Sequence, residues 1–265
     1  MAVAASTAVR ATLAGPVQPA VAVGAPAGAV YLRAADGELI AVLGPAAARL
    51  PIGAVAGNEN LLGNRPSTCQ QGQVGGGRIE TSCFSAHVVR WWNPRPTLPP
   101  LAPGVLATNL AQLADHGAPA ATGLPDRALR ATLPALGAAL RERDETAAVD
   151  AAATLVGLGP GLTPAGDDVL VGLLSALTCL GGPAFTRVAV DVQAAAAGRT
   201  TDLSLALLRH AALGHCVGAV GALLRALAGL GQLQATSRKL LAVGHSSGAA
   251  LCAGVVLGAD VAARL

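Results

Sequence analysis

The stretch GLGPGLTPAGDDVLVGLL, residues 157–174, decides how the second half of the chain is organised. Its glycines and two prolines come just before two adjacent aspartates and an apolar run. This order predicts a turn that leads into a helix, with Thr163 as the N-cap and Pro164 as the first helical residue. The free amides at such a helix start attract anions, so the turn is a candidate anion-binding site.

Other interpretations of the same stretch explain less. A tight turn with two acids near the helix dipole accounts for one acid and one cap, but not for so many special residues in twelve positions. A nucleotide-binding P-loop is excluded, because Asp167 and Asp168 stand where that motif needs Lys and Ser/Thr. Adjacent carboxylates also repel anions. A divalent cation such as Mg²⁺ on Asp167 or Asp168 would remove that conflict, which makes both residues candidate metal ligands.

Two further turns precede predicted helices. In RTTD, residues 199–202, Arg199 is a two-pronged donor for an anion, and the two threonines add hydroxyl groups. The alternative is that Thr201 is only an N-cap beside a surface arginine. His210 and His215 follow five residues apart, a spacing that does not place two metal ligands on one helix face, so we expect structural or solvent-facing roles for them.

The third turn is GHSSG, residues 244–248, which matches the G-x-S-x-G pattern of serine hydrolases. A hydrolase of that kind needs an acid and then a histidine after the serine, and no histidine follows Ser246. We therefore interpret it as a turn into the last helix, with Ser246 or Ser247 as the cap. If the three helix starts meet at one end of a helical bundle, their amides and hydroxyls surround one small anion.

Composition narrows the class of protein. The chain has 265 residues, of which 52% are hydrophobic and 12% charged, with a net charge of +3. There is no basic stripe with interleaved aromatics, so nucleic acid is not expected as a partner. The longest apolar stretches are interrupted by glycines or proline and lack flanking aromatics, so we expect buried helices and no membrane span. The odd number of cysteines (five), without a C-x-x-C pair, disfavours a disulfide framework and fits a reducing cytoplasm.

The two halves differ in pattern, which predicts an α+β protein. Residues 1–105 are expected to form a β-rich, barrel-like domain with a hairpin at Asp36-Gly37, a Gly-rich loop at 72–77 and a strand pair or long strand over 78–92. Residues 106–265 are expected to form a compact helical domain. The helices are predicted at 125–143, 144–158, 166–180, 185–197, 201–213, 216–230, 232–243 and 247–263.

The motifs resemble a known bacterial family. Residues 157–174 are similar to its G-x-G-P-G-L-T-P-S-G-D-D signature, and RTTDLSLALLRHAALGH (199–215) and VGHSSGAALCAGVVLG (243–258) follow in the same order. That family includes the AllH subunit of oxamate carbamoyltransferase. Ala165 replaces the usual serine of the signature, and Ala249 stands where an aspartate often follows. These departures are consistent with a changed substrate or an altered role of the last motif.

The resemblance implies a cytoplasmic subunit of a complex that acts in allantoin degradation. Three different subunits together cleave oxalurate with phosphate to oxamate and carbamoyl phosphate. Its partners would then be the other carbamoyltransferase subunits and a small anion: phosphate, carbamoyl phosphate, oxalurate or oxamate. The alternatives are a non-catalytic anion-binding or scaffold subunit, and a stand-alone metal-dependent phosphotransferase.

On this reading the candidate residues fall into two groups. Asp167, Asp168 and Arg199 are the candidate catalytic residues. Ten others are expected to bind the substrate or phosphate: Gly159, Gly161, Thr163, Gly166, Thr200, Thr201, His245, Ser246, Ser247 and Gly248. No cofactor is certain, and Mg²⁺ on the two aspartates is the candidate.

Overall fold

A computed structural model describes residues 1–26, 28–57, 70–115, 127–244 and 246–264. The chain divides into two compact units, Met1–Pro94 and Arg95–Leu265. The first holds the strands and the second holds the long helices, so the predicted α+β class is confirmed.

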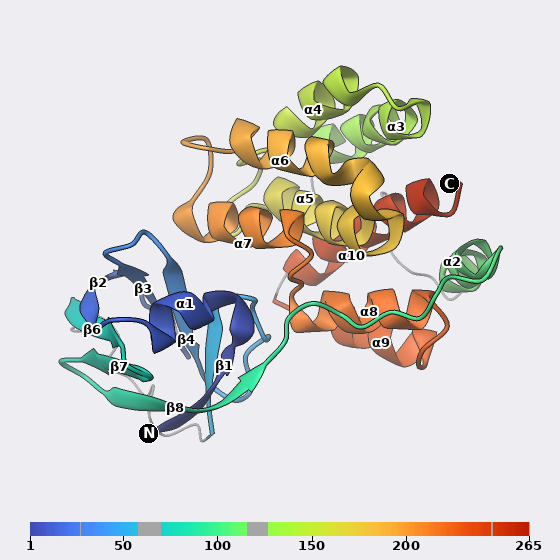
Figure 1. Ribbon diagram of the computed structural model, residues 1–265. Helices are drawn as coiled ribbons and strands as arrows, with labels where there is room; N and C mark the ends of the chain where they lie inside the picture. Colours follow the sequence, from blue (N-terminus) through green and yellow to red (C-terminus); the bar gives the residue numbers. More distant parts are fainter. Residues whose placement is uncertain (27, 58–69, 116–126, 245, 265) are drawn as a thin grey trace. The chain divides into compact units, whose positions relative to one another are not determined.

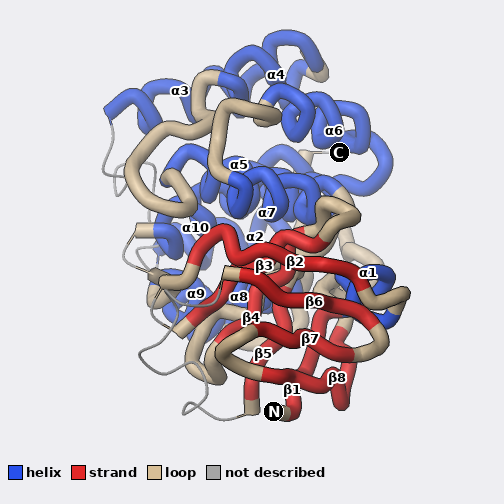
Figure 2. The backbone as a smooth tube through the Cα atoms, turned by 90° about the vertical axis from the view of Figure 1, so that its left-hand side faces the viewer, coloured by secondary structure: helices blue, strands red, loops and turns tan. Residues whose placement is uncertain are grey.

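The first unit is a closed barrel (Figure 2). Its strands follow the order β1-β5-β4-β3-β2-β6-β7-β8, with parallel pairs at β1–β8 and β4–β5 and antiparallel pairs elsewhere. The strands are β1 (Ala2–Ser6), β2 (Gln18–Gly24), β3 (Ala29–Ala34), β4 (Leu39–Leu43), β5 (Gly53–Ala56), β6 (Gln71–Gly75), β7 (Arg78–Thr81) and β8 (Ser85–Trp92). A short 3₁₀ turn, η1 (Thr7–Val9), and helix α1 (Arg10–Ala14) lie between β1 and β2.

Two expectations for the barrel are confirmed, the hairpin at Asp36-Gly37 and the first of the two forms considered for residues 78–92. The predicted hairpin joins β3 to β4 in antiparallel register, and Gly37 takes the positive φ of 86° that the turn requires. The segment 78–92 forms the strand pair β7–β8. The predicted loop at 72–77 is wrong, because most of it is strand β6. Gly72 is in a strand for a packing reason: a Cβ there would overlap the carbonyl oxygen of Glu80 on β7.

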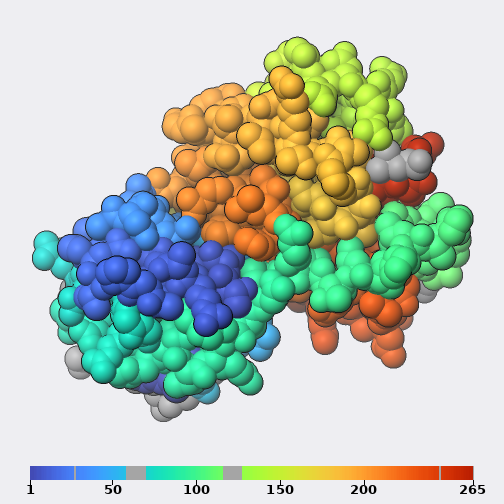
Figure 3. Space-filling view, viewed as in Figure 1, coloured from blue at the N-terminus to red at the C-terminus, as the bar shows by residue number. Residues whose placement is uncertain are grey.

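The second unit is helical (Figure 1), and every predicted helix is present. Its helices are α2 (Val105–Asp115), α3 (Arg127–Glu142), α4 (Glu145–Ala153), α5 (Ala165–Ala176), α6 (Thr186–Ala195), α7 (Asp202–Ala212), α8 (Gly218–Leu227), α9 (Leu233–Leu241) and α10 (Ser247–Ala262). A π-helical turn, η5 (Leu177–Gly181), and a 3₁₀ turn, η6 (Gly182–Phe185), join α5 to α6. In the space-filling view, α4, α6 and α7 form much of the visible face of this unit (Figure 3).

Helix α5 is the core of the helical unit, and all of its residues are buried. It packs closely against α10, because glycines remove the side chains that would keep the two backbones apart. A Cβ on Gly172 would overlap the carbonyl of Leu251, and one on Gly254 would overlap the carbonyl of Val169. Within the described residues, one stretch, Ala165–Ala195, is long and apolar enough to cross a membrane, but 61% of its most apolar window is buried inside the unit.

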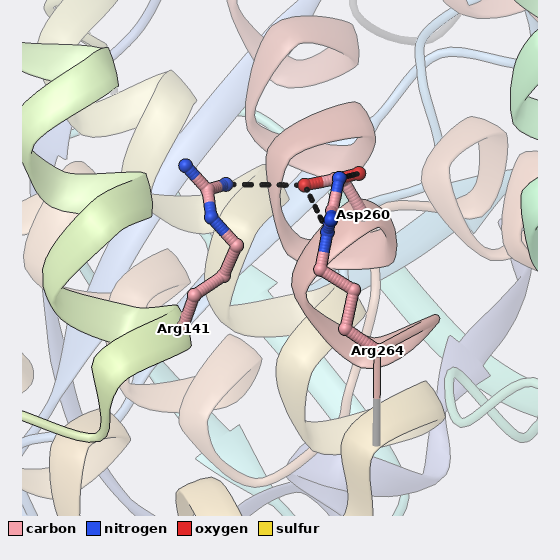
Figure 4. Close-up of polar contacts among 3 residues, drawn as sticks. All are labelled: Arg141, Asp260 and Arg264. Carbon is pink, nitrogen blue, oxygen red and sulfur yellow. Dashed lines mark hydrogen bonds and ion pairs between the residues drawn. The ribbon is translucent and has the colours of Figure 1, made fainter.

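A surface ion-pair network joins the ends of α3 and α10 (Figure 4). The Asp260 carboxylate accepts hydrogen bonds from Arg141 at 3.1 Å and from Arg264 at 3.0 Å. Side chains this exposed contribute little to stability, since water screens the charges. The network therefore orients the helix ends and supplies little of the free energy of folding.

The cysteines differ from the sequence-based expectation at one position. Cys83 is disulfide-bonded, whereas Cys179, Cys216 and Cys252 are free thiols. The odd cysteine count and the spacing did not indicate this bond.

Candidate functional site

The site lies at the start of α5, where the glycine-rich turn enters the helix. Helix α5 begins at Ala165, with Pro164 in the N-cap position and no side-chain cap. Thr163 is therefore not the cap that was predicted. Its hydroxyl instead lies 3.3 Å from the hydroxyl of Ser247, the first residue of α10. This contact joins the first motif to the third.

Asp167 joins the first motif to the second. Its side chain is buried, and its Oδ1 accepts a hydrogen bond of 2.8 Å from the amide of Gly157. Its Oδ2 accepts a short hydrogen bond from the hydroxyl of Thr200. The two carboxylate oxygens of Asp167 thus link the glycine-rich turn to the segment just before α7. The role of Asp167 is therefore structural.

Asp168 is the chemically distinctive residue of the site. It is 3% exposed, and its Oδ2 has no hydrogen-bond partner among the described residues. Burial raises its pKa from 3.8 to about 7. Hydrogen bonds to Ser247 and Thr163 oppose the rise, and the charge of Asp167 adds to it. Near neutral pH this carboxyl exchanges a proton easily, which is the property of a general acid or base.

The three predicted turns do meet in space. Besides the contacts of Asp167 and Thr163, the hydroxyl of Thr201 donates to the carbonyl of Leu162 at 2.6 Å. The same oxygen accepts the amide of Ser204 at 3.1 Å, so Thr201 caps α7, which is the alternative role considered for it from the sequence. In Figure 1, α5 accordingly runs beside both α7 and α10.

The glycines of the first motif have different roles. Gly159 and Gly161 are exposed and take positive φ values of 119° and 100°, which other residues rarely adopt. Gly166 is needed for packing, because a Cβ there would overlap the carbonyl of Leu155. Its amide is also occupied by the carbonyl of Leu158, at 2.9 Å. Among the glycines expected to bind the substrate or phosphate, Gly159 and Gly161 therefore remain candidate amide donors and Gly166 does not.

Arg199 does not point into the site. Its guanidinium donates to the carbonyls of Ala153 and Ala195, the last residues of α4 and α6, at 2.9 and 3.4 Å. These carbonyls have no partner within their own helices, so the arginine satisfies them in the way a C-cap does. The predicted anion contact of Arg199 is replaced by this structural one.

The third motif, residues 244–248, contributes fewer side chains to the site than the sequence predicts. Ser246 occupies the N-cap position of α10, but its side chain makes no cap hydrogen bond and is exposed. Gly248 is a packing glycine, because a Cβ there would overlap the carbonyl of Leu240. His245 lies outside the described residues. Among the described residues of this motif, Ser247 is the one that reaches the site.

The residues present fit a divalent cation poorly. Mg²⁺ prefers six oxygen ligands in near-octahedral geometry. Both oxygens of Asp167 are already engaged, which leaves Asp168 as the available carboxylate. Within the described ranges, no group of three or more His, Cys, Asp or Glu side chains is arranged to hold a metal ion. We therefore assign no step to a metal.

A second cluster was missed by the sequence reasoning. The Sγ atoms of Cys179 and Cys216 lie 3.8 Å apart, and Nδ1 of His210 lies 3.2 Å from Nδ1 of His215. The histidines meet because α7 ends at Ala212 and the chain turns back. No local motif signals the thiol pair, since its members are separated by 37 residues.

The fold and site define a protein with a barrel unit and a helical unit, the latter carrying a buried acid at a helix start. Residues 155–259, all in the helical unit, match the model of the family described as oxamate carbamoyltransferase subunit AllH. This match confirms, over that segment, the resemblance recognised from the three motifs. No curated protein and no solved structure gives a significant match.

Proposed function

We propose that this chain is a subunit of an oxamate carbamoyltransferase-type complex and that the α5 site takes part in its carbamoyl transfer. The supporting observation is that three separate turns meet around Asp167 and Asp168, where the buried Oδ2 of Asp168 has no hydrogen-bond partner among the described residues. The family match over residues 155–259 supplies the reaction class. The partners would be the other subunits of the complex, and we place it in the cytoplasm.

The proposed reaction needs positioning and one proton transfer. A phosphate oxygen attacks the ureido carbonyl carbon of oxalurate, and a tetrahedral intermediate forms. The bond from that carbon to the oxamate nitrogen then breaks. The products are carbamoyl phosphate and oxamate, and the departing nitrogen must gain a proton. Holding the reactants in line and supplying this proton together lower the barrier.

The residues at the start of α5 match these needs. The exposed amides of Gly159 and Gly161 and the positive end of the helix suit a phosphate oxygen. Asp168, with a pKa of about 7, would donate the proton to the leaving nitrogen and accept it in the reverse direction. The hydroxyls of Thr163 and Ser247 hydrogen-bond to Asp168 and would keep it oriented.

The test is turnover by the complex assembled with its partner subunits, with carbamoyl phosphate formation from oxalurate and phosphate as the readout. Asp168→Asn keeps the shape of the side chain but cannot transfer the proton. We expect it to lower kcat by about 10²- to 10⁴-fold, the range of general acid–base catalysis. Asp150→Asn, at an exposed position on α4, is the matched control and should leave kcat unchanged.

Other outcomes would identify the alternatives. Assembly and full turnover with Asp168→Asn would show that this chain is a scaffold or a non-catalytic anion-binding subunit. Mg²⁺-dependent phosphoryl transfer by the isolated chain, abolished by a chelator, would show a stand-alone phosphotransferase. A thermal-shift panel of phosphate, carbamoyl phosphate, oxalurate and oxamate, with and without Mg²⁺, tests whether the isolated chain binds these anions.

A further inference from the structure

Two thiols far apart in the sequence face each other in the helical unit. Cys179 lies in the π-helical turn η5, and Cys216 lies just before α8. Their Sγ atoms are 3.8 Å apart, and both thiols point at one carbonyl, that of Gly214, at 3.6 and 3.7 Å. A disulfide needs the sulfurs about 2.05 Å apart, so a modest movement of the two side chains would bring them to bonding distance.

The surroundings make the two thiols chemically unequal. Hydrogen bonding from Cys216 lowers the pKa of Cys179. Burial opposes this shift, and Thr178 and the positive charge of Arg95 add to it. The same hydrogen bond and deep burial raise the pKa of Cys216. Cys179 is half-buried whereas Cys216 is buried. A half-buried thiol of lowered pKa beside a buried thiol of raised pKa is the arrangement of an attacking and a resolving cysteine.

Arg95 lies beside the pair, and its positive charge lowers the pKa of both thiols. Its guanidinium donates to the carbonyl of Leu213 and lies against Gly214, next to the carbonyl that both thiols address. The π-helical turn that carries Cys179 is a rare conformation that occurs frequently at functional sites.

We propose that Cys179 and Cys216 form a peroxide-reactive dithiol that closes reversibly into a disulfide. This activity is separate from the carbamoyl-transfer site, because it uses neither Asp168 nor the turns around it. When closed, the bond would tie the end of the α5–η5 segment to the loop between α7 and α8.

The chemistry uses hydrogen peroxide as the oxidant and proceeds in two steps. The Cys179 thiolate attacks one peroxide oxygen, the O–O bond breaks, and the released hydroxide takes up a proton to become water. The thiol of Cys216 then attacks the sulfenic sulfur of Cys179, the S–S bond forms, and the sulfenic oxygen leaves with the Cys216 proton as a second water. Two thiols are oxidised and one peroxide is reduced. A dithiol reductant reverses the change.

The experiment treats the full-length wild-type chain with hydrogen peroxide, alkylates the remaining thiols after unfolding, and maps the peptides by mass spectrometry. We expect the peptides carrying Cys179 and Cys216 to become linked, with the loss of two hydrogens, and a dithiol reductant to restore both thiols. Linked protein should also melt at a higher temperature, because the bond closes a long loop.

Variants and an internal control separate this pair from nonspecific oxidation. Cys252 is buried, and burial raises its pKa to about 11, so Cys179 should react with an alkylating agent at least about tenfold faster. Cys216→Ser should leave Cys179 trapped as a sulfenic acid, and Cys179→Ser should leave Cys216 unoxidised. Oxidation of Cys179 no faster than Cys252, or oxidation in the wild type without the linked peptide, would overturn the proposal.

Discussion

Asp168 shows how one buried residue couples the proposed chemistry to stability. In the folded chain its pKa is about 7, whereas its ordinary value is 3.8. Between these values the folded state holds a proton that the unfolded state has released. The free energy of unfolding therefore falls as pH rises from about 4 to about 7, by up to about 1.4 kcal/mol per pH unit from this residue.

We predict that Asp168→Asn removes the fall in the free energy of unfolding between pH 4 and pH 7, because asparagine does not ionise. The stability of the variant relative to the wild type should therefore rise from pH 4 to pH 7. The total gain should be a few kcal/mol, as expected from the pKa shift of Asp168. The measurement is denaturant unfolding of both proteins across this range, with Asp150→Asn as the control that should follow the wild type. A constant difference between variant and wild type would show that the carboxyl ionises normally.

Thr200 offers a test of the structural role of Asp167. Thr200→Val keeps the shape of the side chain but leaves the buried Oδ2 of Asp167 without its hydroxyl donor. We expect a loss of about 1–3 kcal/mol in the free energy of unfolding. The control is Thr236→Val on α9, whose hydroxyl donates only to carbonyls of its own helix region and should change stability by less than about 0.5 kcal/mol.

Single residues of the site could be predicted only in part. The sequence identified Asp167, Asp168 and Thr200 as polar residues in unusual turns, and the structure brings them together. It could not tell that Arg199 satisfies helix-end carbonyls, because its shorter contact is with Ala153, 46 residues earlier in the chain. The raised pKa of Asp168 depends on its burial in the folded chain, which no local pattern reports.

Among the helices, the close contact of α5 with α10 depends on glycine. We predict that Gly254→Ala destabilises the chain by at least about 1–3 kcal/mol, because the added methyl group would overlap the Val169 carbonyl. Gly221→Ala on α8 is the matched control. Its Cβ would meet neighbours at ordinary distances of 3.6 Å or more, so the change should be neutral or stabilising by up to about 1 kcal/mol. Thermal unfolding of both variants decides between these expectations.

Helix positions followed from periodicity, whereas one strand did not. Apolar residues at three- and four-residue spacing predicted α3 to α10 because each helix buries one face or more. The sequence predicts a loop where β6 lies, because glycine has low strand propensity. Gly72 is needed because a side chain there would overlap the backbone of β7. The pairing of β6 with β7 becomes apparent only once the barrel has formed.

At the scale of the whole molecule, the hydrogen bonds that build the proposed site among the described residues lie within Arg95–Leu265. We predict that a fragment of residues 95–265 folds and keeps the pH dependence assigned to Asp168. The measurement is circular dichroism and unfolding of the fragment beside the full chain, each compared with its own Asp168→Asn variant. A fragment that unfolds, or that loses the difference between the two proteins, would show that the barrel unit supports the site.

The sequence alone determined the two-part α+β organisation, the helix positions and the three glycine- and hydroxyl-rich turns, because these depend on composition, periodicity and turn chemistry within short segments. Only the tertiary structure decided which polar groups meet: Asp167 with Thr200, Thr163 with Ser247, and Cys179 with Cys216. Burial and hydrogen bonding between distant segments set the protonation of Asp168 and the inequality of the two thiols. These quantities arise from packing, and no stretch of the chain carries them by itself.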